Sequence, residues 1–270
     1  GVQTCALPIF APLLRPAAYV ALEQLAPKAP QAYRFTSIVN ASEDSHATAE
    51  RSIAPGQLQA KDRPLANDFV SDQEFDRLLA AWFGNIARVL IPGGGFYIWG
   101  GYANCGNYPP VLKRCELYFA QAIIWIKEHP VLTRKDFMGN HEWCFYGWKE
   151  GAAHRFFGPN NVPDTWSIKK VNPQSMVHLT EKPVELARRA IEYSSRPGEN
   201  VLDLFGGSGS TLIGAEMTGR HAFLMELDAL YCDVIVQRWE KFTGRKAERL
   251  PAKGVAEEKA ATRVAAGSKA

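Results

Sequence analysis

The fold of this 270-residue chain is decided by the stretch Val201–Thr211, VLDLFGGSGST. Its apolar start, Val201–Phe205, is typical of a buried strand, and Gly206–Gly209 of a tight turn that opens a helix at Ser210–Thr218. Glycines allow a sharp bend and the close approach of a ligand, and the first N–H groups of the helix can bind a polar group. The next strand, His221–Glu226, ends in a carboxylate that can accept hydrogen bonds from both hydroxyls of a ribose. The pattern predicts a site for an adenosine-containing cofactor.

The glycine spacing separates the possible cofactors. A dinucleotide fingerprint counted from Gly207 and Gly209 needs glycine or alanine where Leu212 stands, and a phosphate-binding P-loop needs a Gly-Lys-Ser/Thr that does not follow. One alternative is a strand, turn and helix whose glycines serve packing alone, but Glu226 at the right spacing favours a cofactor. The remaining match is to the F-x-G-x-G motif: Phe205–Gly209 resembles that of S-adenosylmethionine-dependent methyltransferases.

Local signals upstream predict further elements of an α/β chain. Ser71, with Glu74 three residues on, is typical of a capping box, and apolar residues then recur at helical spacing up to Val89. We expect strands at Phe96–Trp99 and Ala120–Lys127 and helices from Pro110, Pro183 and Ala229. Together they predict a Rossmann-like fold with a mostly parallel sheet and helices on both faces.

Composition narrows the class of protein. With 46% hydrophobic residues, the chain can bury a full core, and no run of about 18 apolar residues predicts a membrane span. The five cysteines form no CxxC pair, which argues against a disulfide framework or a zinc site and favours the reduced cytoplasm. The net charge of +3 is compatible with a polyanionic partner but too small to indicate one.

We expect three regions. Residues 1–66 are poorly organised apart from a candidate strand at Tyr33–Asn40, residues 67–250 form the main domain, and residues 251–270 form a disordered tail. The opening GVQTCALPI lacks an initiator methionine and resembles translated sequencing-adapter sequence. We therefore expect the true amino terminus to be truncated or replaced.

From about Asn67 to Arg249 the sequence resembles the DNA amino-methyltransferases of permuted, beta-type motif order, which act on adenine N6 or cytosine N4. Asp68–Trp99 matches the family's helix–LKPGG–strand unit. His178–Pro183, HLTEKP, matches the H-P-T-x-K-P segment, with Leu179 in place of the usual proline. Glu226-Leu227-Asp228 and Tyr231 match the pattern of an acid and a tyrosine after the second strand of the cofactor site.

The resemblance implies S-adenosyl-L-methionine as cofactor, double-stranded DNA as partner and no membrane, and leaves a homodimer and a restriction partner open. We favour adenine N6 over cytosine N4. Lys182 is expected to neutralise the cofactor's carboxylate. The implied cofactor-binding residues are Thr180, Lys182, Asp203, Phe205, Gly207, Ser210, Thr211 and Glu226.

The family's catalytic motif, D/N-P-P-Y/F/W, is absent from these residues. In the family, its acidic or amide side chain directs the lone pair of the target amine at the methyl group, and its ring stacks on the flipped base. Asn107–Pro110 has the right residues in the wrong order, Asn172–Ser175 lacks the second proline and the ring, and Asn40 is followed by neither. The catalytic residue stays unknown, and we expect weak or no methyl transfer from this chain. A catalytically inactive cofactor- or DNA-binding fragment is the alternative.

Residues 128–177 occupy the family's target-recognition position and are rich in aromatic and basic side chains. A small insert with its own packed aromatic core is the simpler interpretation of Trp143, Phe145, Tyr146 and Trp148. A methyltransferase acting on RNA or a small molecule is a third hypothesis, disfavoured by this segment and by the permuted order. The expected DNA contacts are Arg134, Lys135, Arg155, Lys169 and Lys170.

Overall fold

The computed structural model describes residues 35–41, 71–100, 105–130, 136–172, 174, 181–226 and 228–249. Within these ranges the chain builds a seven-stranded sheet in the order β5-β3-β4-β2-β1-β6-β7. The strands are β1 Phe35–Ala41, β2 Gly95–Gly100, β3 Leu117–Ile126, β4 His141–Lys149, β5 Thr165–Ser167, β6 Asn200–Asp203 and β7 His221–Leu224.

The sheet is mixed but mostly parallel, as predicted. β1 runs parallel to β2 and β6, and β6 to β7, while β4 runs antiparallel to both β2 and β3. Strands β1, β2, β3, β6 and β7 therefore end at one edge, which we call the C-terminal edge. β4 begins there, since Trp143 pairs with Gly100 and His141 pairs with Ile126.

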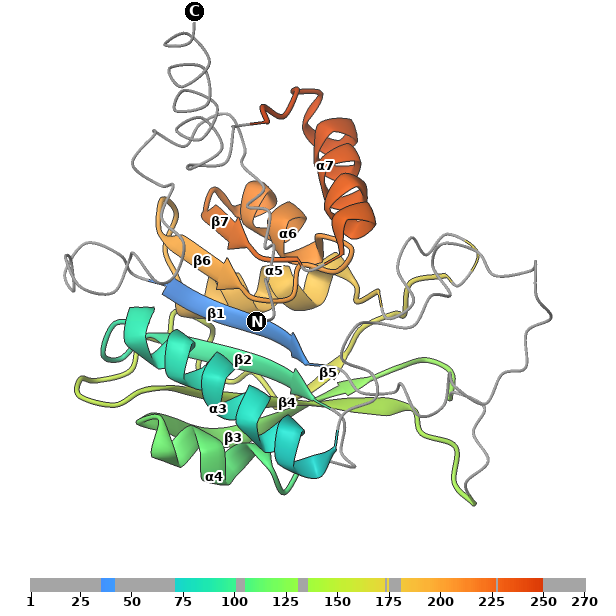
Figure 1. The fold of residues 1–270 in the computed structure, drawn as a ribbon. Coiled ribbons are helices and arrows are strands. Elements are labelled where there is room, and N and C mark those ends of the chain that lie inside the picture. Colours follow the sequence, from blue (N-terminus) through green and yellow to red (C-terminus); the bar gives the residue numbers. More distant parts are fainter. Residues whose placement is uncertain are drawn as a thin grey trace, which may run out of the picture.

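Helices cover both faces of the sheet, also as predicted (Figure 1). They are α3 Asp72–Val89, α4 Tyr108–Arg114, α5 Val184–Ser194, α6 Ser210–Thr218 and α7 Ala229–Thr243. Alternate residues of β2 divide two cores: Phe96 and Ile98 pack with α3 and α4, whereas Tyr97 and Trp99 pack in the core that contains α5, α6 and α7. None of the helices in the described ranges has both the length and the apolarity needed to cross a bilayer.

The capping box predicted for α3 is confirmed. The Ser71 side chain accepts a hydrogen bond from the backbone N–H of Glu74 at 3.3 Å, and the helix ends at Val89. Its apolar stripe, Phe75, Leu79, Phe83 and Ile86, is buried. Removing one orphan N–H from the solvent-free end and burying one face is sufficient to fix this helix.

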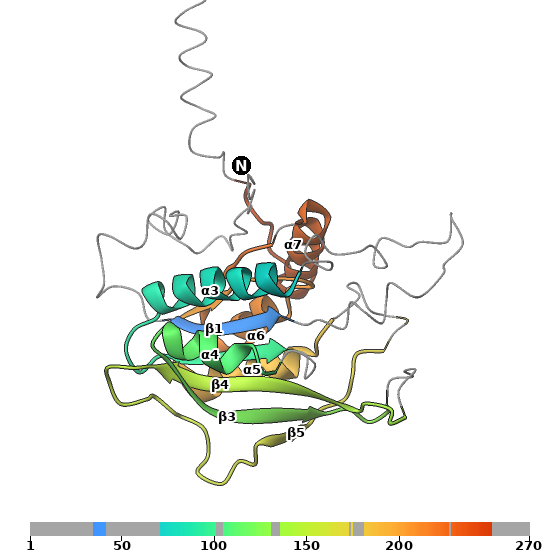
Figure 2. The same ribbon diagram turned by 60° about the horizontal axis from the view of Figure 1, so that its bottom comes forward.

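Two strands lie outside the regions expected for them. β1 comes from the segment that we expected to be poorly organised, yet it occupies the centre of the sheet between β2 and β6. β4 comes from the expected insert, yet it is inserted between β2 and β3, and Figure 2 shows it beside β3 and β5. The aromatic residues of β4 therefore belong to the main cores rather than to a separate one: Phe145 stacks on Tyr108 of α4 at 4.7 Å between ring centroids. Pairing between distant segments decides both placements.

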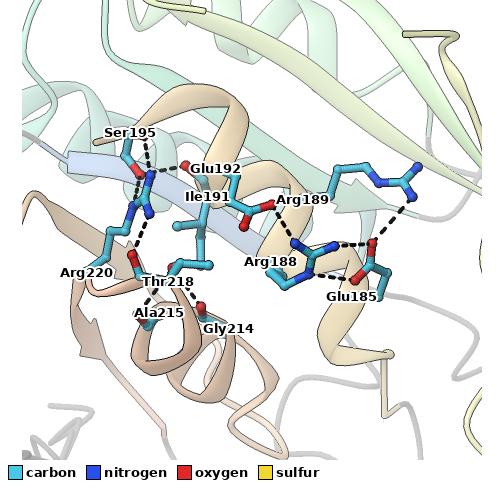
Figure 3. Close-up of polar contacts among 10 residues, drawn as sticks. All are labelled: Glu185, Arg188, Arg189, Ile191, Glu192, Ser195, Gly214, Ala215, Thr218 and Arg220. Atoms are coloured by element: carbon cyan, nitrogen blue, oxygen red, sulfur yellow. Dashed lines mark hydrogen bonds and ion pairs between the residues drawn. The ribbon is translucent and has the colours of Figure 1, made fainter. Parts of the chain in front are cut away.

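Close packing of α5 against α6 supports the β6 side of the sheet (Figure 3). A Cβ on Gly214 of α6 would lie 3.1 Å from the backbone nitrogen of Arg188, so the helices approach closely because this residue is glycine. Arg188 itself pairs with Glu185 on its own helix at 2.7 Å. Arg220, after α6, donates Nη2 to the carbonyl oxygen of Ser195 at 2.6 Å and joins the two helix ends.

Candidate cofactor-binding site

The glycine loop, residues 205–209, lies at the C-terminal edge between β6 and α6. Gly207 and Gly209 have φ values of 52° and 79°, in the left-handed region that glycine adopts without strain. A Cβ on Gly209 would lie 3.0 Å from the Ile235 side chain of α7, and a Cβ on Gly206 would lie 2.9 Å from it. The loop thus needs glycine both for its bend and for its contact with α7.

Glu226 follows β7 and faces this loop, as predicted. Its Oε2 accepts a hydrogen bond from the backbone N–H of Gly207 at 2.8 Å, and its Oε1 accepts one from that of Asp228 at 3.0 Å. The two bonds orient the carboxylate across the loop. Carboxylate lone pairs that remain can accept hydrogen bonds from hydroxyl groups.

Asp203, the last residue of β6, is fully buried beneath the loop. It accepts hydrogen bonds from Thr211 Oγ1 at 2.7 Å and from the backbone N–H of Phe205 at 3.0 Å, and so ties the strand to the start of α6. Burial, helped by the nearby Glu226 charge, raises the pKa of Asp203 to about 7 despite these bonds and the charge of Lys182.

Lys182 belongs to a buried cluster of three charges at the same edge. Its Nζ lies 3.0 Å from Oε2 of Glu142, the second residue of β4, while Lys127 Nζ lies 2.7 Å from Glu142 Oε1. Burial alone would raise the pKa of Glu142, but the two lysines outweigh it and lower the pKa to about 2. With one carboxylate between two ammonium groups, the cluster keeps a net positive charge.

Other predicted cofactor residues lie around this centre. Ser210 donates its hydroxyl to the carbonyl oxygen of Lys182 at 2.7 Å, which joins the start of α6 to the segment before α5. The Phe205 ring packs edge-on against Trp82 of α3, with centroids 4.7 Å apart. Thr180 lies outside the described residues.

The expected DNA contacts are placed unevenly. Lys169 and Lys170 follow β5, whose Ser167 pairs with Ile126, and so lie near the C-terminal edge. Lys169 forms an exposed ion pair with Glu128 at 3.5 Å. Arg134 and Lys135 lie outside the described residues.

Arg155 is not brought to this edge. It follows the end of β4 and pairs at 2.7 Å with Glu199, the residue before β6, so it lies at the opposite edge of the sheet. A partly buried ion pair that joins two segments accounts for this arginine without a ligand.

The segments weighed as catalytic motifs have structural roles or stay untested. Tyr108 is fully buried as the first residue of α4, and Asn107 donates Nδ2 to Asp76 at 2.9 Å. Asn172 accepts a hydrogen bond from the backbone N–H of Gln174 at 3.0 Å in a local turn. Asn40 lies in β1 opposite Trp99, one residue before the strand ends at the C-terminal edge.

Sequence reasoning missed Lys127, Glu142 and Trp82 as neighbours of the site. Their sequence neighbourhoods carry no motif, and only the pairing of β3 with β4 and the packing of α3 bring them together. Among the side chains that the structure describes, no group of three or more His, Cys, Asp or Glu residues could hold a metal ion.

Comparison with known proteins agrees with this geometry. A DNA methylase family, of the N6/N4 type, matches residues 59–237. Since the match covers more than half of the sequence, the chain belongs to this family. Type II methyltransferase M.HinfI of Haemophilus influenzae is 26% identical over 191 residues, which are 64% of this chain and 52% of the relative. Type II methyltransferase M.BglII of Bacillus subtilis is 23% identical over 189 residues, 56% of this chain and 52% of the relative. The chain thus spans about half the length of these curated relatives.

Solved structures share the fold. The M1.HpyAVI–SAM complex has a TM-score of 0.60 at 19% identity and matches 80% of this chain and 94% of its own. The DNA modification methylase TTHA0409 of Thermus thermophilus, complexed with S-adenosyl-L-methionine, has a TM-score of 0.57 at 20% identity, covering 84% and 93%. The cytosine-N4-specific PvuII DNA methyltransferase has a TM-score of 0.58 at 18% identity, covering 81% and 83%.

Proposed function

We propose that this chain binds S-adenosyl-L-methionine at the glycine loop and forms the core of a DNA methyltransferase directed at an exocyclic amine. The observation that carries the proposal is the approach of Glu226 to Gly207 at 2.8 Å across a left-handed glycine loop at the C-terminal edge. In open α/β sheets, ligands bind in the crevice outside the carboxyl ends of the strands. Family membership and the names of the relatives support the same reaction class.

The described residues divide the binding work. Glu226 accepts hydrogen bonds from the ribose hydroxyls, Gly207 leaves room for the adenosyl group, and Lys182 holds the carboxylate of the amino-acid end. Glu142 and Lys127 keep the Lys182 ammonium at the site before a ligand arrives. The cofactor, when bound, supplies an activated methyl group. The target amine would then approach from the end of β1, which lies beside β6 at this edge.

Double-stranded DNA is the proposed partner, with adenine N6 as first target and cytosine N4 as second. Both amines remain within the proposal, because one structural neighbour is cytosine-N4-specific. Lys169 and Lys170 are the described candidates for DNA contacts at the C-terminal edge, and Arg134 and Lys135 are candidates from sequence alone. Contacts of this kind position the duplex through its phosphates.

Two measurements test the proposal together. Isothermal titration with S-adenosylhomocysteine reports cofactor binding, and transfer of a labelled methyl group to unmethylated genomic DNA reports the reaction. Binding together with transfer supports an active enzyme. Absence of binding would reject the cofactor site and the proposal with it.

A second candidate function is a cofactor- or DNA-binding module that does not transfer methyl groups. It is favoured by one observation: no D/N-P-P-Y/F/W motif occurs in the sequence, and Asn40 near the end of β1 is followed by Ala41-Ser42-Glu43. Tight binding of S-adenosylhomocysteine without detectable transfer to any DNA would support this module over the enzyme.

A further inference from the structure

Helix α7 contacts the glycine loop through two neighbouring turns. Ile235 closes against Gly206 and Gly209, as described above. One turn later, Arg238 donates Nη1 to the carbonyl oxygen of Ser208 at 3.0 Å and to the Ser208 hydroxyl at 2.9 Å. The helix therefore supports the loop from behind with one apolar and one charged side chain.

The same guanidinium also holds the segment before α5. Arg238 Nη1 lies 2.8 Å from Oε1 of Glu181, whose side chain is only 5% exposed. Glu181 precedes Lys182, and the carbonyl of Lys182 accepts the Ser210 hydroxyl at 2.7 Å. One arginine thus joins the loop that would contact the adenosyl group to the segment that carries the lysine for the carboxylate.

We propose that Arg238 is a positioning residue of the cofactor site, which keeps the glycine loop and Lys182 in mutual register. This inference rests on the proposed cofactor site, but not on methyl transfer. A guanidinium presents several N–H donors in a rigid plane, so one side chain can fix two segments where an ammonium would hold one contact at a time. Binding is tighter when both halves of a site are held before the ligand arrives, because less ordering has to accompany binding.

The test measures the Kd of S-adenosylhomocysteine by isothermal titration, together with the Tm of each variant. Arg238→Met should raise the Kd by about tenfold or more, because both segments must then be ordered by the ligand. Arg238→Lys keeps the charge beside Glu181 but loses the planar fork, and should give an intermediate Kd. A change confined to Tm would not distinguish positioning from simple stabilisation, so two further variants are needed.

Arg245 supplies a matched control on the same side of the molecule. It follows α7, pairs with Glu216 of α6 and lies 4.7 Å from the Trp239 ring centroid. Arg245→Met therefore also removes an inter-helix ion pair and should lower Tm, yet it should leave the Kd within about twofold, because it does not touch the loop.

The double variant Arg238→Met/Glu181→Gln separates stability from register. Its second substitution removes the buried carboxylate that the first leaves unpaired, so Tm should recover. The Kd should stay weak, because the loop and Lys182 remain untied, and this variant carries the test if Arg238→Met does not fold. A native Kd in either Arg238→Met variant would overturn the role of Arg238. Absence of binding by the parent chain would instead reject the proposed function.

Discussion

Asp203 should make the stability of the folded chain fall between pH 5 and pH 8. Its carboxyl is fully buried, and burial raises its pKa from 3.8 to about 7. In the unfolded chain the carboxyl is exposed and ionises near 3.8. Between these two pKa values the folded chain binds a proton that the unfolded chain has lost, so stability is greatest below pH 3.8 and falls as pH rises towards 7.

The size of the effect follows from the two pKa values. At 1.36 kcal/mol per pKa unit, the folded chain prefers the neutral acid by about 4 kcal/mol. Linkage then gives a loss of about 2.5 kcal/mol in the free energy of unfolding between pH 5 and pH 8, with little further change above that range. The native hydrogen bonds from Thr211 and Phe205 are compatible with either charge state.

Asp203→Asn removes the titration while keeping the shape. The amide oxygen can accept the N–H of Phe205, and the amide nitrogen can donate to Thr211 once that hydroxyl rotates. Urea unfolding followed by the fluorescence of buried Trp99, Trp125 and Trp239 gives the free energy of both proteins from pH 5 to pH 8. The difference between parent and variant isolates Asp203, because every other titrating group is shared. A pH-independent difference would refute a buried, neutral Asp203.

Three further outcomes follow from the charges at the site. Glu226→Ala should weaken S-adenosylhomocysteine binding by about tenfold or more, since each hydrogen bond to a charged group contributes about 1.5–3 kcal/mol; titration with exposed Glu240→Ala as control checks this, and an unchanged Kd removes Glu226 from the site. Lys182→Met should weaken S-adenosylhomocysteine but leave 5′-methylthioadenosine unaffected, because the latter has no carboxylate; equal losses for both ligands would contradict the role of the lysine. Glu142→Gln should lower the free energy of unfolding by about 3 kcal/mol at pH 7. Because the folded pKa of Glu142 is about 2, that contribution is present above pH 4.5 and lost as pH falls towards 2, so parent and variant should converge in acid, and a constant difference in urea unfolding would count against the cluster.

The local signals of the sequence were sufficient for much of the cofactor side. Ser71 and Glu74 set the start of α3, and the glycine loop and Glu226 meet as expected. Each of these features depends on residues close in the sequence or on neighbouring strands joined by one helix, as in β6-α6-β7. Short connections of this kind have few alternative arrangements.

The other half of the site depends on contacts that no local pattern encodes. Glu142 lies in a segment rich in aromatic residues, which suggested a separate insert, and the strand β4 is buried on both faces and shows no alternation. Its place between β2 and β3 is fixed by pairing across the sheet. Arg155 shows the converse: a basic residue in the expected recognition segment is occupied by Glu199 at the wrong edge.

Strand direction explains why these separate parts form one site. β6 and β7 end at the C-terminal edge and deliver the glycine loop and Glu226, while β3 ends there with Lys127 following it. β4 runs in the opposite direction and so begins at the same edge, which puts Glu142 within reach of Lys127 and Lys182. An antiparallel strand in an otherwise parallel region therefore contributes its first residues, not its last, to the ligand edge. That is why the acid near the start of β4, and the arginine near its far end, have different fates in the same fold.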